Sequence, residues 1–192
     1  MIDREPVDAV SVPRWLRVTI AVAAVVLTFA GVGLPVYVFP AQGDPAGADL
    51  LYVIGPPTEP RLEHARELFD DRAEAMLVSV SSAQLGDGEF AASALPICGE
   101  ANVTCATPEP FTTNGEAGML TSFAAEHEIG KTVVITFTPH VARTRYIFAR
   151  CYNGEVTVVG VDENLSPLDW VYQYAYQTAA FVKAWVTPCA GG

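Results

Sequence analysis

The feature that most limits the fold of this chain is a long uncharged segment near its N-terminus. Residues 18–39 read VTIAVAAVVLTFAGVGLPVYVF and contain no charged side chain. Roughly 20 apolar residues are enough for a helix to cross the ~30 Å hydrocarbon core of a bilayer. A cleaved signal peptide is the alternative, but its apolar region usually runs about 7–15 residues. The length therefore predicts an uncleaved signal-anchor, a single transmembrane helix over residues 18–39.

The charges that flank this segment predict its orientation. Arg14 and Arg17 stand just before it, whereas the next charges after it are Asp44 and Asp49. Basic flanks of transmembrane helices stay in the cytoplasm. We therefore expect a single-pass protein of the cell membrane, with residues 1–17 as a short cytoplasmic tail and the remaining chain outside the cytoplasm. The lipid bilayer is then the first expected partner.

All four cysteines follow the apolar segment, on its expected outer side. An even number of cysteines in an oxidising compartment predicts disulfides rather than free thiols. Three pairings are open, and we favour Cys98–Cys105, which closes a short loop, with Cys151–Cys189, which ties down the C-terminus. No Cys-x-x-Cys motif is present and the histidines are not at ligand spacing from the cysteines, so we expect no metal site.

Composition and missing motifs exclude several classes of function. The chain has 22 acidic and 11 basic residues, a net charge of −11, which argues against nucleic-acid binding because that needs a basic surface. There is no G-x-G-x-x-G dinucleotide motif, no phosphate-binding P-loop and no G-x-S-x-G nucleophile turn. No cofactor is therefore expected.

Beyond a Pro/Gly/Ala-rich linker at residues 40–48, short apolar runs alternate with helical patterns. Strands are expected near residues 49–54, 75–80, 103–106, 132–137 and 156–161. Helices are expected over residues 60–72, 114–128, 139–150 and 167–186, and residues 84–97 predict a loop with a short helix. This alternation indicates a parallel sheet covered on both faces. Residues 49–192 are predicted to form one Rossmann-like α/β domain, a doubly wound three-layer sheet of about five strands in the order 3-2-1-4-5.

Local chemistry marks the starts of three of these helices. Thr113 lies three residues before Glu116, which is a capping-box spacing. Thr138 and Ser166 each precede a proline, the residue favoured at the first helical position, and Asp169 lies three after Ser166. In the last helix, an apolar stripe is predicted to face the core, formed by Val171, Tyr174, Phe181, Val182 and Trp185.

A ligand site in such a sheet would lie at the carboxyl ends of the strands, near the switch in strand order. Polar or glycine residues follow three of the expected strands, and they form the candidate site: Gly55, Thr112, Thr113, Glu116, Thr138, His140, Arg143 and Arg145. Helix N-termini at this rim also present free N–H groups that favour anions. The pattern predicts a small anionic ligand as a second partner.

The three most reactive side chains of this set have distinct expected roles. Glu116 and His140 are the acid–base candidates, because an imidazole can move a proton near neutral pH. Arg143 offers a planar fork for a carboxylate or a phosphate. Each also has a structural alternative: Glu116 could only close a capping box, His140 could be an ordinary first-turn residue, and Arg143 could be a solvated helix charge.

The motifs TTNGEA (residues 112–117), VVITF and TPHVARTR (residues 138–145) resemble the YdcF/SanA/ElyC-type family of bacterial envelope proteins. Arg61 matches the first helix of that family. The resemblance covers roughly residues 48–187 and implies a Rossmann-like fold, an inner-membrane anchor, a link to peptidoglycan metabolism and a ligand-binding role for Arg61. Two departures are clear: Gly55-Pro56-Pro57 replaces a glycine-rich turn, and residues 79–82 (SVSS) replace Ser-Gly-Gly.

Two functions of different class fit these observations. The first is a membrane-anchored envelope protein that binds, and also processes, a small anionic ligand or cell-wall precursor. The second is a non-catalytic envelope module that recognises a component or scaffolds a partner. The sequence alone leaves open whether the domain is an enzyme.

Overall fold

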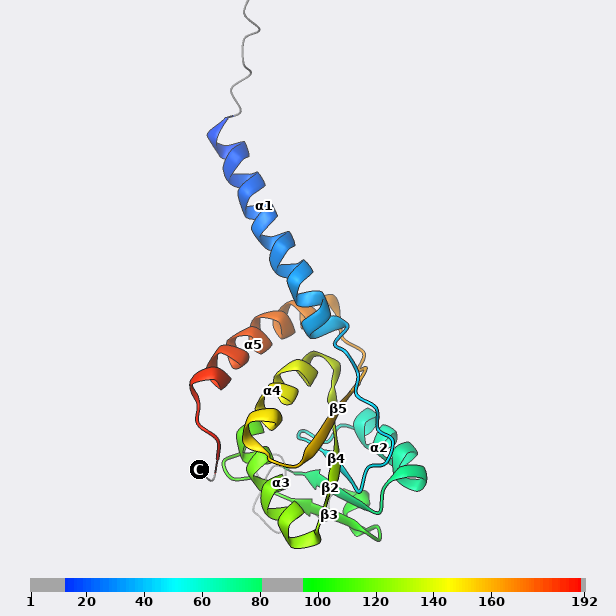
Figure 1. Ribbon diagram of the computed structural model, residues 1–192. Coiled ribbons are helices and arrows are strands. Elements are labelled where there is room, and N and C mark those ends of the chain that lie inside the picture. Colours follow the sequence, from blue (N-terminus) through cyan, green and yellow to red (C-terminus); the bar gives the residue numbers. More distant parts are fainter. Residues whose placement is uncertain (1–12, 81–94, 191–192) are drawn as a thin grey trace, which may run out of the picture.

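The computed structural model describes residues 13–80 and 95–190, apart from the side chains of residues 70–72. One helix projects from an α/β domain (Figure 1). The elements are α1 (Arg14–Gly33), the π-helical turn η1 (Leu34–Val38), β1 (Leu50–Val53), α2 (Glu59–Arg72), β2 (Ala75–Ser79), η4 (Pro96–Gly99), β3 (Val103–Ala106), α3 (Thr113–His127), β4 (Lys131–Phe137), η5 (Thr138–His140), α4 (Val141–Cys151), β5 (Glu155–Val161) and α5 (Pro167–Val186). Most of the expected cytoplasmic tail and of the expected loop at 84–97 lies outside the described residues.

The five strands form one parallel sheet in the order β3-β2-β1-β4-β5, as predicted. The chain moves outward from β1 to β3, then returns to β4 on the other side of β1. Val53, at the end of β1, pairs with Val78 of β2 and with Ile135 of β4. The switch in strand order therefore lies between β1 and β4, and the carboxyl ends of β1, β2 and β4 share one edge.

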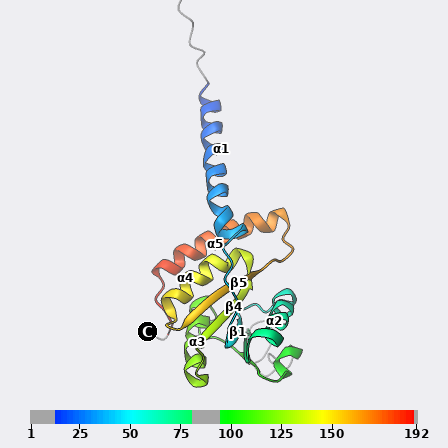
Figure 2. The ribbon, with the colours of Figure 1, turned by 45° about the vertical axis from the view of Figure 1, so that its right-hand side comes forward.

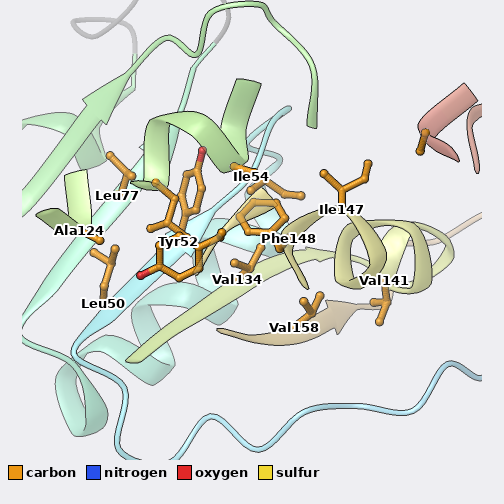
Figure 3. Packing of buried hydrophobic residues seen from close by; sticks show 14 residues of the cluster. Leu50, Tyr52, Ile54, Leu77, Ala124, Val134, Val141, Ile147, Phe148 and Val158 are labelled. Carbon is orange, nitrogen blue, oxygen red and sulfur yellow. The ribbon is translucent and has the colours of Figure 1, made fainter. Parts of the chain in front are cut away.

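Alternate residues of β1 build the two faces of the core. Leu50 and Tyr52 pack with α3 and α4 on one face, where Tyr52 meets the ring of Phe148 edge-on at 6.1 Å (Figure 3). Leu51 and Val53 pack on the other face with α2 and η4. All four residues of β1 are fully buried, which a strand covered on both faces requires. The uninterrupted apolar run predicted this three-layer arrangement.

Two disulfides close the domain with the pairings favoured from the sequence. Cys98 in η4 is bonded to Cys105 in β3, with Cα atoms 5.6 Å apart. Cys151 at the end of α4 is bonded to Cys189, with Cα atoms 5.4 Å apart, and this bond ties down the segment after α5. Both separations lie in the ordinary range for disulfides. The bonds are consistent with an oxidising compartment.

The helix starts differ from prediction at two places. Thr112, rather than Thr113, caps α3, because its extended backbone lets its hydroxyl accept a hydrogen bond from the N–H of Gly115 at 3.2 Å. A Cβ on Gly115 would collide with the carbonyl oxygen of Pro110, so the tight approach to this cap requires glycine. Residues Thr138–His140 form a 3₁₀ turn, so α4 begins two residues later than expected. The predicted capping box of Ser166 and Asp169 is present.

The prediction for α5 was wrong about which face is buried. Three members of the expected inward stripe are exposed, namely Val171, Val182 and Trp185. The buried residues of the helix are Gln177 and Ala184 instead. Gln177 is turned inward because it is hydrogen-bonded to Arg143 of α4. The other members of the stripe, Tyr174 and Phe181, are half-buried.

Residues Arg14–Val38, which include α1 and η1, form one helical segment long and apolar enough to cross a membrane. The segment starts four residues before the uncharged stretch predicted from the sequence and ends one residue earlier. Its apolar side chains, such as Val25 and Leu27, are exposed along most of its length. Such a surface is costly in water and is typical of a helix that lies in lipid.

Candidate functional site

The candidate site lies at the carboxyl edge of the sheet, around the switch point between β1 and β4. Gly55 follows β1, Ser79 ends β2, and His140 follows β4 through η5. The first turn of α3 brings Thr113 and Glu116 to the same place, because residues three apart lie on one face of a helix. The site therefore forms where ligands bind in open parallel sheets.

Glu116 is the acid of the site whose pKa departs most from its usual value. Its side chain is buried, and Oε1 accepts a hydrogen bond from the backbone N–H of Gly55 at 2.7 Å. Burial raises the pKa of Glu116 to about 7, against the opposing effects of the Gly55 N–H and the charges of Arg143 and Arg61. The carboxyl does not cap its own helix. Glu116 can therefore exchange a proton close to neutral pH.

Three side chains converge on Gly55. A Cβ placed there would lie 3.4 Å from Glu116 Oε1, from Ser79 Oγ and from the ring of Phe111. Within residues 13–80 and 95–190, the buried hydroxyl of Ser79 has no hydrogen-bond partner by geometry. No glycine flanks Ser79 in the sequence, so no nucleophile turn was predicted there, and Phe111 was not predicted as a site residue.

His140 is buried between two hydroxyl groups. Its Nδ1 lies 2.9 Å from Thr136 Oγ1, and its Nε2 lies 3.4 Å from Thr113 Oγ1. Burial, with the nearby charges of Arg143 and Arg61, holds the pKa of His140 well below its usual value. The ring is therefore neutral at physiological pH. It is suited to orienting the two threonine hydroxyls, and poorly suited to accepting a proton.

Arg143 lies half-buried beside this histidine. Its Nε donates to Gln177 Oε1 at 3.0 Å and its Nη1 donates to Thr113 Oγ1 at 3.4 Å, while the guanidinium lies 5.9 Å from the ring centre of Tyr176. Thr113 therefore connects Arg143 with His140. In the described part of the chain, Arg143 forms no ion pair. Gln177 and Tyr176 were missed from the sequence, because α5 was expected to bury its other face.

Arg61 is buried and already engaged. Its Nε donates to Glu163 Oε1 at 2.7 Å and its Nη1 donates to the carbonyl oxygen of Pro56 at 2.8 Å. Thr58 donates to the same oxygen of Glu163 at 2.8 Å, and the guanidinium lies 4.9 Å from the ring centre of Phe137. These contacts hold the turn after β1 in place. Arg61 is thus paired with Glu163, and its charge lowers the pKa values of Glu116 and His140.

The remaining predicted site residues make structural contacts. Thr138 donates to Asp162 Oδ1 at 2.5 Å, and Thr112 caps α3. Arg145 donates to the carbonyl oxygen of Ala41 in the linker at 2.5 Å, so the structure does not bring it to the other residues. Asp162 and Glu163 were missed from the sequence, although two acids directly after a strand are the signal that could have identified them.

A separate groove of about 580 Å³ lies elsewhere, between the outer side of α3 and the segment held by the Cys151–Cys189 disulfide. It contains none of the predicted catalytic or anion-binding residues. No group of three His, Cys, Asp or Glu side chains that could hold a metal ion occurs among residues 13–80 and 95–190. The ionisable side chains that the structure brings to the site are Glu116, His140, Arg143 and the paired Arg61.

The fold and site define a doubly wound α/β domain with a polar cluster at its switch point, joined to an apolar helix. No protein-family model, curated protein or solved structure matches this chain.

Proposed function

We propose that this chain is a membrane-anchored protein of the cell envelope whose outer domain binds a small anionic ligand beside Arg143. The apolar segment Arg14–Val38 supports the anchor, and the two disulfides support a domain outside the cytoplasm. Arg14 and Arg17 on one side and Asp44 and Asp49 on the other support this orientation. The resemblance to the YdcF/SanA/ElyC-type family supports a cell-wall precursor as the ligand class.

The partial burial of Arg143 without a counter-charge among the described residues is the main support for an anion site. Its guanidinium is half-buried and bonded to two neutral acceptors, Gln177 and Thr113, with no ion pair among the described residues. A partly desolvated charge without a counter-charge is unfavourable, and an anion in the site would offset that cost. The guanidinium fork suits the two oxygens of a carboxylate or phosphate.

Glu116 supports a second step, the processing of the bound ligand. With a pKa of about 7, its carboxyl is protonated in part of the molecules and ionised in the rest at neutral pH. It could then give a proton to a leaving oxygen or take one from an attacking hydroxyl. His140 stays neutral and would position Thr113, which touches both His140 and Arg143.

The second candidate is a non-catalytic envelope module, and the hydrogen bonding of His140 and Arg61 favours it. Both ring nitrogens of His140 are occupied by threonine hydroxyls, and Arg61 is paired with Glu163. These residues act as fixed supports. A recognition module needs only the anion-binding part of the site, without a proton-transfer step.

The test is a thermal-shift screen of the full-length protein in detergent with three probes: inorganic phosphate, N-acetylglucosamine 1-phosphate and a muramyl dipeptide. We expect at least one probe to raise the melting temperature of the native protein and of the Arg145→Ala variant, since Arg145 contacts the linker. The Arg143→Ala variant should show no shift with the same probe. A shift that survives Arg143→Ala would remove Arg143 from the site.

Turnover decides between the two candidates. If the native protein and not the Glu116→Gln variant consumes the bound probe, the site is catalytic. If the native protein and the Glu116→Gln variant both bind the probe without consuming it, the domain is a non-catalytic binding module.

A further inference from the structure

Helix α5 exposes a continuous apolar stripe. Its members recur at spacings of four and three residues, so they share one side of the helix: Leu168, Tyr172, Ala175, Ala179, Val182 and Val186. Leu168 at one end is 81% exposed and Val186 at the other is 80% exposed. Val171 and Trp185 lie at the edge of this stripe and are also exposed. An exposed apolar surface of this length marks a place of contact with another phase or molecule.

The inward side of the same helix is partly polar. Gln177 is 1% exposed, and its side chain accepts from Arg143 and donates to Gln173. A helix on a water-covered surface turns its apolar stripe toward the core and its amides toward solvent. In the middle of α5 this arrangement is reversed: the amide of Gln177 is buried and the apolar side chains are exposed. Such an outer face is unfavourable in water.

The base of the apolar helix α1 is packed directly against α5. Tyr174 of α5 donates its hydroxyl hydrogen to the carbonyl oxygen of Ala30 at 3.1 Å, and its ring lies 5.1 Å from that of Tyr37. The hydroxyls of Tyr37 and Thr178 lie 2.9 Å apart. A Cβ on Gly33 would collide with the ring of Tyr174, so glycine allows this close approach.

The direction of α5 relative to α1 identifies the phase that covers its outer face. In both ribbon views α5 runs crosswise to α1 at the point where α1 leaves the domain (Figures 1 and 2). A helix that spans a bilayer runs roughly along its normal. If α1 spans the bilayer, a second helix that crosses it at its base would lie along the membrane surface.

We propose that α5 is a second membrane element that lies in the interface of the outer leaflet, with its apolar stripe among the upper acyl chains. The proposal rests on the membrane anchoring proposed above. Tyr172, Tyr176 and Trp185 supply aromatic rings of the kind enriched at this depth. Binding is apolar rather than electrostatic, because α5 carries only Asp169 and Lys183 as charges and the whole chain is acidic.

The experiment uses the full-length, disulfide-bonded protein as single copies in nanodiscs of zwitterionic phosphatidylcholine. Part of the lipid carries bromine on the upper acyl chain, which quenches tryptophan fluorescence on contact. Two variants each keep one tryptophan of the three: Trp15→Phe with Trp170→Phe leaves Trp185 as the reporter in α5, and Trp170→Phe with Trp185→Phe leaves Trp15 as the reporter in α1.

We expect brominated lipid to quench Trp185 about as strongly as Trp15, with little effect of salt. Quenching of Trp15 without Trp185 would overturn the interfacial position of α5 while leaving the anchor intact. Quenching of neither residue would overturn the anchor and the inference together. Blue-shifted emission of Trp185 without quenching would mean that protein covers α5, and this too overturns the inference.

A substitution provides an independent measurement. Val171→Asp with Val182→Asp, in the variant that keeps Trp185, should lower the quenching of Trp185. Thr121→Asp with Ser122→Asp, on the exposed side of α3, is the matched control and should leave it unchanged. Equal quenching in all three proteins would contradict the proposed depth of α5. Circular dichroism of each variant checks that the fold is retained.

Discussion

The buried carboxyl of Glu116 should make the domain less stable as pH rises, and the size of the effect follows from its pKa. Burial raises that pKa from 4.5 to about 7. The folded state therefore holds the proton more tightly than the unfolded state. Between these two values the unfolded chain ionises first, so the contribution of Glu116 to stability is greatest below about pH 4.5 and falls until pH passes 7. Linkage gives a loss of about 2–3 kcal/mol between pH 5 and pH 8.

The Glu116→Gln variant isolates this effect. An amide oxygen can still accept the hydrogen bond from the N–H of Gly55, but the side chain cannot ionise. We expect the native protein to lose about 2–3 kcal/mol relative to Glu116→Gln as pH rises from 5 to 8. Contributions of other groups, including the neutral His140, cancel in the difference between the two proteins.

The assay is urea unfolding of the full-length protein in detergent, with both disulfides intact, at pH 5, 6, 7 and 8. The matched control is Glu126→Gln, which changes an exposed carboxyl on the same helix α3. Its unfolding free energy should stay parallel to that of the native protein across the pH range. Parallel curves for Glu116→Gln as well would refute the claim that burial raises the pKa of Glu116.

Three further predictions concern the packing of the domain, each measured as the urea-unfolding free energy. Phe148→Ala removes a fully buried ring that meets Tyr52 and should cost about 3–5 kcal/mol, whereas a loss below about 1 kcal/mol would show that the core does not depend on it. Replacing both Cys151 and Cys189 by serine opens a loop of 38 residues and should cost about 3–4 kcal/mol, and an unchanged value would mean that the bond restricts the unfolded chain little. Thr112→Ala should cost about 1 kcal/mol and Thr112→Ser much less, because a hydroxyl at this position caps α3, and equal losses would argue against the cap.

The sheet could be predicted because the strands are marked by short apolar runs in the local sequence. The uninterrupted apolar run over residues 50–54 requires cover on both faces, and helical patterns between such runs require parallel crossovers. The order 3-2-1-4-5 was chosen as a common doubly wound arrangement, since these two constraints fit other orders as well, and the structure confirms it. The sequence left three disulfide pairings open, and loop length and the position of Cys189 favoured the one that the structure shows.

The orientation of α5 could not be predicted, because the helix is apolar on more than one side. Val171, Val182 and Trp185 look like a core stripe when the sequence is considered alone. The deciding contact is Gln177 with Arg143, which joins residues 34 positions apart. Such a contact belongs to tertiary structure and leaves no periodic signal.

Part of the candidate site was predictable and part was not. Glu116, His140 and Arg143 were predicted because each follows a strand or begins a helix at the carboxyl edge. The link between them was not, because the adjacent hydroxyls of Thr112 and Thr113 are equivalent as caps in the sequence. Tertiary contacts distinguish the two residues: the hydroxyl of Thr113 is hydrogen-bonded to His140 and Arg143, and the hydroxyl of Thr112 caps the helix.

The energetics of the site favour a binding role over a purely structural one. A glutamine at position 116 would accept the same hydrogen bond from Gly55 without the cost of a buried carboxyl near neutral pH. Arg143 lowers the pKa of Glu116, yet within the described residues the two form no ion pair that would offset their burial. A structural cluster would gain stability by pairing or removing these charges, whereas a binding site needs them to remain available to a ligand.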